Sequence, residues 1–513
     1  MISRFSKHIL SKSTFIRGSI CKKSLWLYKN RKDLIPPTSP GQQFIFDQGH
    51  TVGRLAQKLF PGGGDACPAT PFDYQPSLEL TQKLIAEGRQ VIYEAAFQYD
   101  GVLAALDILV KKDDGWHGFE VKSSTKVHDI NVTDAALQFW VMAGSGIELK
   151  DISIIHINSD YERHDDNSVI TFNINPGDFD PYDNLDVEKL FKTESVYYLV
   201  LALQDEITEN VAQLKKVVAR KTMPAVPIGK QCTTPYPCNF IDRCFARVPE
   251  ESILDFDLYR KEERFRLYHS GTKKIVDVKD WQKLKPPYNF IVESHLYKRF
   301  YVDPDNLKSF MVKLRFPLRF MDFETVSFAL PPFENSSPYD AMSFQYSLHT
   351  LESEDAEPLH NFFLADPAKD FREDFIIALL ADLGDTGHIL VWSIGFERSK
   401  LNMLSLLYPQ YEERINTVIE RLIDLAIPFQ KRWIYDNSLS CSYSIKSVLP
   451  FVMPDLSYDN LAVKEGQTAS LLFQLMMAEP GKDWSKERND LLEYCCLDTF
   501  AMVVIYRFLN TLV

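Results

Sequence analysis

Two acids and a lysine in the first half of the chain stand at a spacing suited to metal chemistry. Asp107 interrupts the apolar run at residues 103–110, and Glu120 and Lys122 follow the turn signal Asp113-Asp114. If that turn is a two-residue hairpin loop, Asp107 faces Glu120 at about 5 Å, and Lys122 shares the face of Glu120. Facing carboxylates in an apolar run repel each other and lose hydration, and a divalent cation removes both penalties. The hairpin therefore predicts a Mg²⁺ or Mn²⁺ site with Lys122 on the attacked phosphate; an ion pair of Lys122 with an acid is the alternative.

A second set of acids lies in the last 200 residues. Asp322 and Glu324 alternate on an apolar stretch and so share one strand face. Tyr494 and Asp498 stand at i and i+4 of a helix and point the same way. Paired carboxylates of this kind suit two metal ions about 4 Å apart in a phosphoryl-transfer site. The alternative for Tyr494 and Asp498 is a half-buried tyrosine and a solvated acid.

Three closely spaced cysteines predict a metal site of another type. Cys232, Cys238 and Cys244 fall within thirteen residues, and Cys21 is the best-placed fourth ligand. Zinc ribbons usually carry two CxxC-like pairs, which this segment lacks, whereas iron–sulfur clusters accept more varied spacings. Such a site would join segments more than 200 residues apart, so metal loss should loosen the whole domain. The remaining cysteines are predicted to be packing thiols: Cys67, Cys441, Cys495 and Cys496.

The elements that must position these residues follow an α/β pattern. Residues 90–125 predict three successive strands, followed by a helix over 133–143 and a strand over 152–157. The last region alternates similarly, with strands at 318–324, around 341–349 and at 388–393 and a helix around 370–383. The fold class is therefore predicted to be α/β.

Composition describes an ordinary globular chain of several domains. The 513 residues are 45% hydrophobic and 25% charged. No stretch approaches the roughly 20 apolar residues of a membrane span, and eight cysteines are too sparse for a disulfide scaffold. We expect a cytoplasmic protein that is not inserted in a membrane. The sequence pattern divides the chain into three regions: residues 1–249, a largely helical connector at 250–315, and residues 316–513.

The charge is uneven along the chain. The net charge is −13, yet residues 1–32 carry nine Lys or Arg and no acid. This segment could supply phosphate contacts, and an organellar transit peptide is the alternative. Against the transit peptide, the segment directly after Cys21 resembles core; it comprises Leu25, Trp26, Leu27 and Tyr28.

The first set of acids resembles a known nuclease signature. Asp107 followed by Glu120-Val121-Lys122 is similar to the PD-(D/E)XK motif, and Gln138 resembles the glutamine of RecB-type members. This resemblance implies a restriction-endonuclease-like fold in residues 1–249 and a catalytic role for the three motif residues. The sequence departs from the family at Met142, where tyrosine is expected. It departs again at Gly53, where the family's histidine would align, which leaves His50 as a weak candidate ligand.

The cysteines extend this resemblance. One cysteine before a RecB-like core and three after it resemble the iron–sulfur nucleases of the AddB and CRISPR-associated kind. The resemblance implies a [4Fe–4S] cluster on Cys21, Cys232, Cys238 and Cys244, with zinc as the alternative metal. Those families begin the triplet with a two-residue gap, whereas this chain has five residues there.

The second set resembles the DEDD exonucleases of the DnaQ-like, ribonuclease H-type fold. Asp322 and Glu324 match the first motif, and Tyr494-x-x-x-Asp498 matches the third, where the tyrosine helps to orient the attacking water. Glu397 stands where the second motif usually has aspartate. Asp424 is either a further acid near the site or a helix-surface charge. Together with the segment at 443–450, both modules resemble a bacterial two-module family with a DEDD-type 3'-5' exonuclease-like domain at 316–513.

These resemblances imply a metal-dependent nuclease acting on DNA, single-stranded or at ends, in repair or in defence against foreign DNA. RNA, the cleavage polarity and protein partners stay open. Phe119, Trp140 and Trp392 could stack on bases, with core packing as the alternative. Two rival hypotheses are a nucleic-acid-binding protein whose nuclease centres have decayed and a zinc-stapled scaffold for protein partners.

Overall fold

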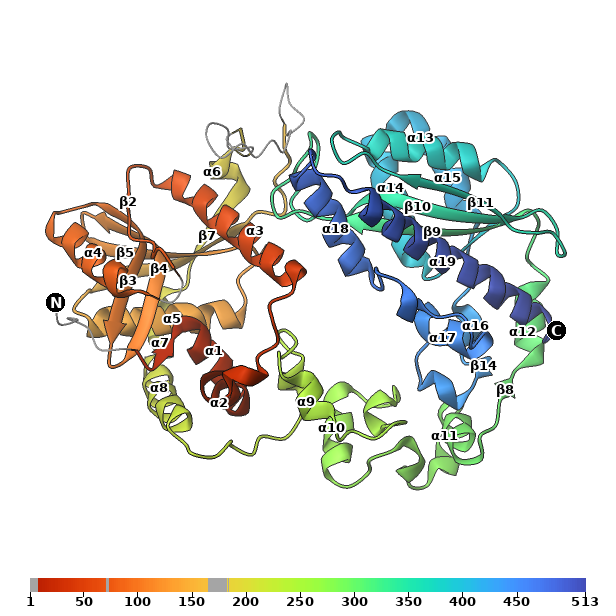
Figure 1. The fold of residues 1–513 in the computed structure, drawn as a ribbon, viewed down its shortest axis with the longest axis horizontal. Coiled ribbons are helices and arrows are strands. Elements are labelled where there is room, and N and C mark those ends of the chain that lie inside the picture. Colours follow the sequence, from red (N-terminus) through yellow and green to blue (C-terminus); the bar gives the residue numbers. More distant parts are fainter. Residues whose placement is uncertain (1–7, 71–72, 165–181, 183) are drawn as a thin grey trace.

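The computed structural model describes residues 8–70, 73–164, 182 and 184–513. It contains two mixed sheets joined by a run of short helices, with helices covering both sheets (Figure 1). The α/β class predicted from the sequence is confirmed. Among the described residues, no helix is both long and apolar enough to cross a membrane.

The first sheet has seven strands in the order β2-β3-β4-β5-β6-β7, with β1 also paired to β4. The strands are β1 (Leu10–Ser11), β2 (Gly64–Asp65), β3 (Val91–Tyr99), β4 (Val102–Lys112), β5 (Gly115–Lys122), β6 (Leu149–Ile157) and β7 (Phe191–Ser195). The predicted strands at 90–125 and 152–157 are therefore present. β3, β4 and β5 form an antiparallel meander because each connecting turn is only two residues long.

Helices pack against both faces of this sheet. On one face, α1, α2, α5 and α8 enclose a core that includes Leu25, which is fully buried. The segment around Leu25 is thus part of the folded core, as its apolar residues indicated. The helices of this region are α1 (Lys12–Ile20), α2 (Lys22–Asn30), α3 (Pro40–Ala56), α4 (Gln75–Ala86), α5 (Asp129–Gly144), α6 (Val187–Leu190), α7 (Tyr197–Ala202), α8 (Gln204–Val218) and α9 (Ile241–Phe245).

The stretch at 250–315 consists mainly of short helices separated by turns. Its elements are α10 (Lys261–His269), α11 (Tyr288–Tyr297), β8 (Tyr301–Val302) and α12 (Pro304–Met311). β8 pairs with β14 (Ile434–Tyr435) of the last region, a strand pairing that the sequence did not indicate. α11 begins directly after Pro287.

The second sheet has five strands in the order β11-β10-β9-β12-β13. They are β9 (Leu318–Val326), β10 (Met342–Leu351), β11 (Leu359–Leu364), β12 (His388–Val391) and β13 (Leu422–Asp424). β10 runs antiparallel to both of its neighbours, β9 and β11, whereas β12 runs parallel to β9 and β13 runs parallel to β12.

Two groups of helices cover this second sheet. α13 (Arg372–Leu383), α14 (Ile394–Leu407) and α15 (Glu412–Glu420) pack on the face that carries Met321 and Phe323. α19 (Ser485–Asn510) crosses the other face and packs on Phe320. The remaining helices are α16 (Ile427–Gln430), α17 (Ile445–Val452) and α18 (Gly466–Ala478). Because side chains alternate along β9, residues 322 and 324 point toward α19.

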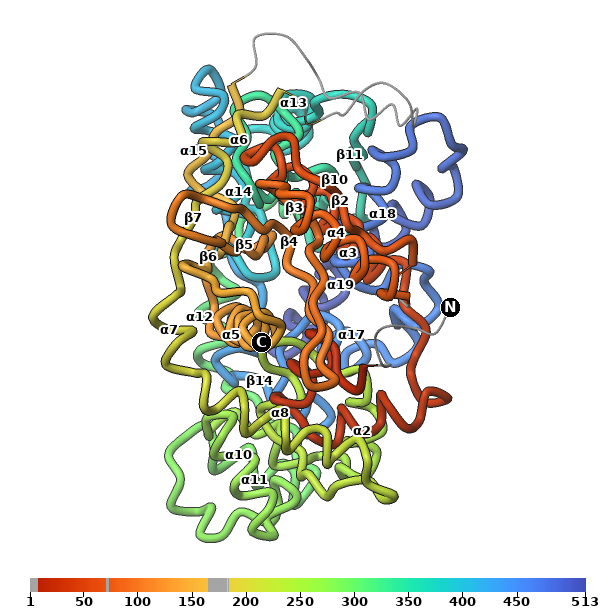
Figure 2. Tube along the Cα trace, turned by 90° about the vertical axis from the view of Figure 1, so that its left-hand side faces the viewer, coloured from red at the N-terminus to blue at the C-terminus, as the bar shows by residue number. Residues whose placement is uncertain are grey.

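The loop after β9 joins the two sheets. Ala329 and Leu330 belong to the same apolar cluster as Phe119 of β5, and the Tyr339 hydroxyl donates to the Ser123 carbonyl. On the other side, α3 and α18 lie side by side (Figures 1 and 2), and Gln48 donates to Gln474 at 2.9 Å. The strand that carries Asp322 and the strand that carries Glu120 are thus physically linked through their adjoining loops.

Candidate functional site

The predicted hairpin register is correct, and the strands part where the acids lie. The β4–β5 pairs run from Lys112 with Gly115 to Ile108 with Phe119. Beyond that pair, the Asp107 side chain accepts a hydrogen bond from the Val121 backbone N–H at 2.6 Å. The carboxylates of Asp107 and Glu120 therefore lie at the opening between two strands.

A third carboxylate, Glu94, completes a row across three strands. The β3–β4 pairs on either side of it are Tyr93 with Ile108 and Ala95 with Leu106, which places Glu94 opposite Asp107. Glu94 itself leaves the ladder with a φ of 51°, a conformation that is uncommon for residues other than glycine. Sequence analysis did not select it, because one acid among apolar strand residues carries no motif.

Glu120 is 1% exposed and holds three charged or polar partners. Lys12 Nζ lies 2.7 Å and Lys122 Nζ 2.6 Å from Oε1, and Gln138 donates to Oε2 at 2.8 Å. Gln138 thus contacts the predicted ligand Glu120 directly. The Lys122 ion pair expected by the alternative interpretation is also present.

Lys12 and Asp134 were missed by the sequence analysis. Asp134 accepts from Lys122 at 2.7 Å, and its place four residues before Gln138 on α5 could have identified it, because i and i+4 share a helix face. Lys12 reaches Glu120 from the beginning of α1, which follows β1. Nothing in its local sequence distinguishes it from the other basic residues of the segment at 1–32.

The acids of this first centre differ in the direction of their pKa shifts. Burial, and then the charge of Glu120, raise the pKa of Asp107 well above its usual range. Burial also raises the pKa of Glu94 to about 7, although Lys12 opposes that rise. Burial acts in the same direction on Glu120, but Lys12 and Lys122 hold the pKa of Glu120 below its usual range.

His50 and the three aromatic candidates are not among the hydrogen-bond or ion-pair partners of Glu120 in the described part of the chain. His50 is exposed on α3. Phe119 is buried in the core. Trp140 donates to Thr208 and Trp392 donates to the Tyr443 carbonyl. All three aromatic side chains thus make packing or hydrogen-bond contacts within the protein.

The four predicted cysteine ligands line one pocket. Cys21 precedes α2, and Cys232, Cys238 and Cys244 approach it from the segment before the connector. The Cys238 thiol donates to Ser24 at 3.5 Å. Burial raises the pKa of Cys21 and of Cys232, and the neighbouring thiols add to both shifts. Of the presumed packing thiols, Cys441 and Cys495 are buried and Cys496 is half-buried, but Cys67 is exposed and the packing prediction is wrong there.

The second acid set converges as its spacing predicted. Asp322 and Glu324 on β9 and Asp498 on α19 offer carboxylate oxygens that lie within 4.8 Å of one another. β9 presents both acids to α19 because they alternate on one face. The Tyr458 hydroxyl donates to Asp498 Oδ1 at 2.6 Å.

Few cationic groups compensate these acids. Burial raises the pKa of Asp322 well above its usual range, and Asp498 and Glu324 add to the shift. Burial followed by the charge of Asp498 raises the pKa of Glu324 to about 8, against the opposing charge of Lys446. Burial also raises the pKa of Asp498 to about 6, although hydrogen bonds from Tyr458 and Tyr494 oppose the rise.

Glu397 lies at the border of this centre. It is 1% exposed on the first turn of α14, and its Oε2 atom has no hydrogen-bond partner. Its charge contributes to the raised pKa of Asp322, and burial raises its own pKa to about 8. Glu397 is not part of the group of ligand atoms within 4.8 Å, which comprises Asp322, Glu324 and Asp498 among the described residues.

The side chain of Asp424 binds backbone N–H groups. It lies on a strand, so the helix-surface interpretation is wrong. This residue ends β13, and its carboxylate accepts from the backbone N–H groups of Ser393, Ile394 and Ala426 at 3.0 to 3.2 Å. These bonds hold the turn that begins α14. Asp424 therefore positions the helix that carries Glu397.

Tyr494, Tyr458 and Lys446 surround the acids from the α19 side. Tyr494 is buried and hydrogen-bonds Asp498. Lys446 Nζ lies 5.2 Å from the centre of the Tyr494 ring and 5.4 Å from that of Tyr458. Tyr458 was missed because it lies in a short turn without a motif, whereas Lys446 belongs to the segment at 443–450 that the family resemblance included.

Comparisons with known proteins cover parts of the chain. The family described as a domain of unknown function, DUF2779, matches residues 319–444, which include Asp322, Glu324 and Glu397. The chain is 27% identical over 225 residues to "Uncharacterized protein MG366 homolog" of Mycoplasma pneumoniae, covering 40% of this chain and 34% of that protein. It is 25% identical over 245 residues to "Uncharacterized protein MG366" of Mycoplasma genitalium, covering 44% and 37%. The chain thus spans about a third of the length of the curated relatives it matches.

Proposed function

We propose that the chain is a metal-dependent nuclease with two acidic centres that hydrolyse phosphodiester bonds of DNA. The observation that carries the proposal is the convergence of Asp322, Glu324 and Asp498, whose oxygens lie within 4.8 Å; Glu324 and Asp498 are buried and Asp322 is half-buried. Their mutual repulsion raises the pKa of Asp322 and Glu324 beyond the shift from burial. Such an arrangement is destabilising on its own, and bound divalent cations would compensate it.

The strand order supports a ribonuclease H-like assignment for the region at 316–513. Three antiparallel strands are followed in the sheet by two parallel ones, and β9, which carries the first two acids, lies at the centre. A buried glutamate oxygen without a partner, Glu397 Oε2, lies beside this centre and is available as a further ligand.

The residues of the second centre divide into ligands and positioning groups. Asp322, Glu324 and Asp498 would hold the cations, with Glu397 at the border. Two bound cations would supply the charge that activates a water and stabilises the leaving oxygen. Tyr458 fixes Asp498 by its 2.6 Å hydrogen bond, and Tyr494 stands where the DEDD resemblance implies a role in orienting the attacking water.

In the first centre, the support for the PD-(D/E)XK assignment comes from the positions of the acids on the sheet. The row of Glu94, Asp107 and Glu120 lies at an opening between strands, with Gln138 holding Glu120. Lys122 is the phosphate-contacting residue in our proposal. A cation that bound Glu120 Oε1 would have to displace Lys12, which lies 2.7 Å from that atom.

The cysteine pocket fits a cluster better than a single zinc ion. In a tetrahedral zinc site with Zn–S bonds of about 2.3 Å, the sulfurs would lie about 3.8 Å apart. Among the described residues, the groups whose ligand atoms lie within 4.8 Å of one another do not include these cysteines. A polynuclear iron–sulfur cluster spans a larger gap, and we propose that Cys21, Cys232, Cys238 and Cys244 hold one.

End-labelled single-stranded DNA with Mn²⁺ tests the proposal. We expect turnover by the wild-type protein, a loss in Asp107→Ala and in Asp322→Ala, and the largest loss in the double variant. Asp113→Ala and Asp355→Ala, which alter exposed acids of the same two regions, are the matched controls. If the double variant retains the wild-type rate, the nuclease proposal is wrong.

The ion pairs at Glu120 give one specific reason to retain the alternative of a decayed, nucleic-acid-binding first module. Lys12 and Lys122 already neutralise that acid without any metal. The Asp322→Ala protein leaves the first module to act alone. If this variant binds the DNA strand without cleaving it, and if adding Asp107→Ala leaves the binding unchanged, the result would support this alternative.

A further inference from the structure

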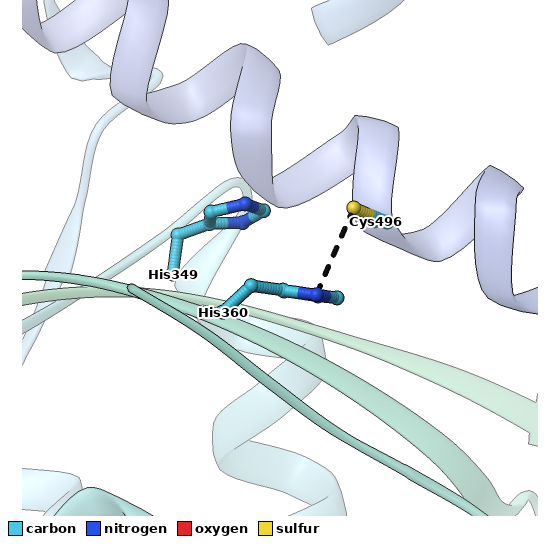
Figure 3. Close-up of side chains that lie close together, drawn as sticks. All are labelled: His349, His360 and Cys496. Carbon is cyan, nitrogen blue, oxygen red and sulfur yellow. Dashed lines mark hydrogen bonds between the residues drawn. The ribbon is translucent and has the colours of Figure 1, made fainter. Parts of the chain in front are cut away.

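A cluster of two histidines and a cysteine lies beside the second acidic centre, since Ser347, which bonds His360, pairs with Asp322 across the strands, but the cluster shares no residue with that centre. His349 on β10 pairs directly with His360 on β11, and the two rings stack with centroids 4.4 Å apart. Cys496 faces His360 from α19, with Sγ 3.9 Å from Nδ1 (Figure 3). One ligand atom from each residue lies within 4.8 Å of the other two.

Hydrogen bonds occupy one ring nitrogen of each imidazole. His349 Nδ1 bonds the Thr499 hydroxyl at 2.8 Å, and His360 Nε2 bonds the Ser347 hydroxyl at 2.9 Å. The two hydroxyls bond each other at 2.7 Å. Each ring thus uses one nitrogen in this network and keeps the other, His349 Nε2 and His360 Nδ1, for a ligand. Metal-binding histidines commonly have such a second hydrogen bond, which fixes the tautomer and orientation of the ring.

We propose that His349, His360 and Cys496 form a site for a borderline divalent ion of the Zn²⁺ class. Imidazole and thiolate ligands favour such an ion over Mg²⁺ or Mn²⁺, which prefer the oxygen ligands of the acidic centres. With Zn–N and Zn–S bonds of about 2.0–2.1 and 2.3 Å, the nitrogen and sulfur atoms would lie about 3.5 Å apart. The 3.9 Å separation of His360 Nδ1 and Cys496 Sγ therefore needs only a small closure.

The position of the cluster indicates what a bound ion would do. His360 is exposed and Cys496 is half-buried, so an ion can enter from solvent and keep one open coordination position. The ion would fasten the edge strand β11 and its neighbour β10 to α19, the helix that carries Tyr494 and Asp498. Burial lowers the pKa of His349 to about 4 and also lowers that of His360, so both rings are neutral near pH 7 and able to bind a metal. This site does not depend on the nuclease proposal.

Titration with Co²⁺ in excess Mg²⁺ tests the site in the full-length protein. The excess Mg²⁺ competes with Co²⁺ for carboxylate ligands, and the acids and the other cysteines contribute equally to all variants. We expect the wild-type protein and Cys67→Ser, the exposed-thiol control, to bind one Co²⁺ more than Cys496→Ser and His360→Ala. The difference spectrum between wild type and Cys496→Ser should show a thiolate-to-Co²⁺ charge-transfer absorption.

Thr499→Val provides an independent measurement. This nearly isosteric change removes the hydrogen bond to His349 and should weaken Co²⁺ binding by about 10–100-fold. His360 is exposed, so His360→Ala carries the test even if the buried Thr499 variant fails to fold. Equal Co²⁺ stoichiometry in wild type, Cys496→Ser and His360→Ala, or a difference spectrum without the charge-transfer absorption, would overturn the proposal.

Discussion

The two acidic centres stabilise their buried carboxylates in opposite ways. In the first, Lys12 and Lys122 lie within 2.7 Å of Glu120 and hold its pKa below the usual range. In the second, burial and the charge of Asp498 raise the pKa of Glu324 to about 8, and Lys446 only partly offsets them. In the first centre the chain's own cations neutralise Glu120, while burial raises the pKa of Asp107 and of Glu94. In the second centre the pKa values of all three acids are raised, so these acids depend on protons or on added metal.

Similar sets of acids can therefore require different changes before a metal ion binds. Cation binding at the second centre would replace protons on Asp322 and Glu324, because burial and the charge of Asp498 raise the pKa of both acids. Cation binding at Glu120 would replace a lysine. We therefore expect the second centre to be the more strongly metal-dependent of the two.

The largest expected effect is that of Asp322→Ala on turnover. The variant is measured in an Asp107→Ala background, so that the remaining Mn²⁺-dependent cleavage reports the second centre alone. We expect a loss of at least about 100-fold, because even residues that only support metal ligands are worth about 10–100-fold. The exposed Asp355→Ala should leave the rate unchanged; an unchanged rate in Asp322→Ala as well would contradict a catalytic role.

Lys12→Met tests the claim that the first centre is neutralised from within. Removing one ammonium from buried Glu120 should lower the free energy of unfolding by roughly 1.5–3 kcal/mol, since Lys122 remains as a partner. Urea denaturation measures the change, with the exposed Lys32→Met as control. Added Mn²⁺ should restore part of the loss, and equal stability of the two lysine variants would show that Lys12 is not a necessary counter-ion.

The pH dependence of stability should reveal the second centre. Acids whose pKa is raised in the folded state bind more protons folded than unfolded, so stability falls as the pH rises toward the raised values. With Asp498 at about 6 and Glu324 and Glu397 at about 8, metal-free protein should lose stability between about pH 5 and pH 8.

Differential scanning calorimetry measures this loss. The melting temperature should fall by at least about 2 °C over that interval, given about 2–4 °C for each kcal/mol in regions of this size. Mn²⁺ and Glu397→Gln should each reduce the fall. A melting temperature that rises between pH 5 and pH 8 without metal would show that these acids are already compensated.

The smallest expected effect is that of Glu397→Asp. Aspartate is the usual residue of the second DEDD motif, and its shorter side chain moves the carboxylate oxygens back toward α14. Because Mg²⁺ demands near-ideal octahedral geometry, we expect the ratio of Mg²⁺- to Mn²⁺-supported rates to change on the order of threefold. An identical ratio in both proteins would place Glu397 outside the metal centre.

The sequence predicted those features that local chemistry determines. The two-residue turn at Asp113-Asp114 set the β4–β5 register, and strand alternation placed Asp322 and Glu324 on one face. Tertiary contacts determine the rest. Lys12 reaches Glu120 across 108 positions of sequence, and no local pattern signals such a contact.

Two strands of the second sheet were also missed. β11 is an edge strand with mostly exposed side chains, so it lacks the alternation that marks a half-buried strand. β13 has three residues, too few to establish a period. Each of these missed strands carries a residue discussed above: His360 lies on β11 and Asp424 lies on β13.

Anomalous scattering from crystals of this chain soaked in Mn²⁺ locates bound cations without reference to activity. We predict Mn²⁺ bound by Asp322, Glu324 and Asp498, and a weaker peak between Asp107 and Glu120 where Lys12 has moved away. Crystals that show no Mn²⁺ at either set of carboxylates would contradict this prediction.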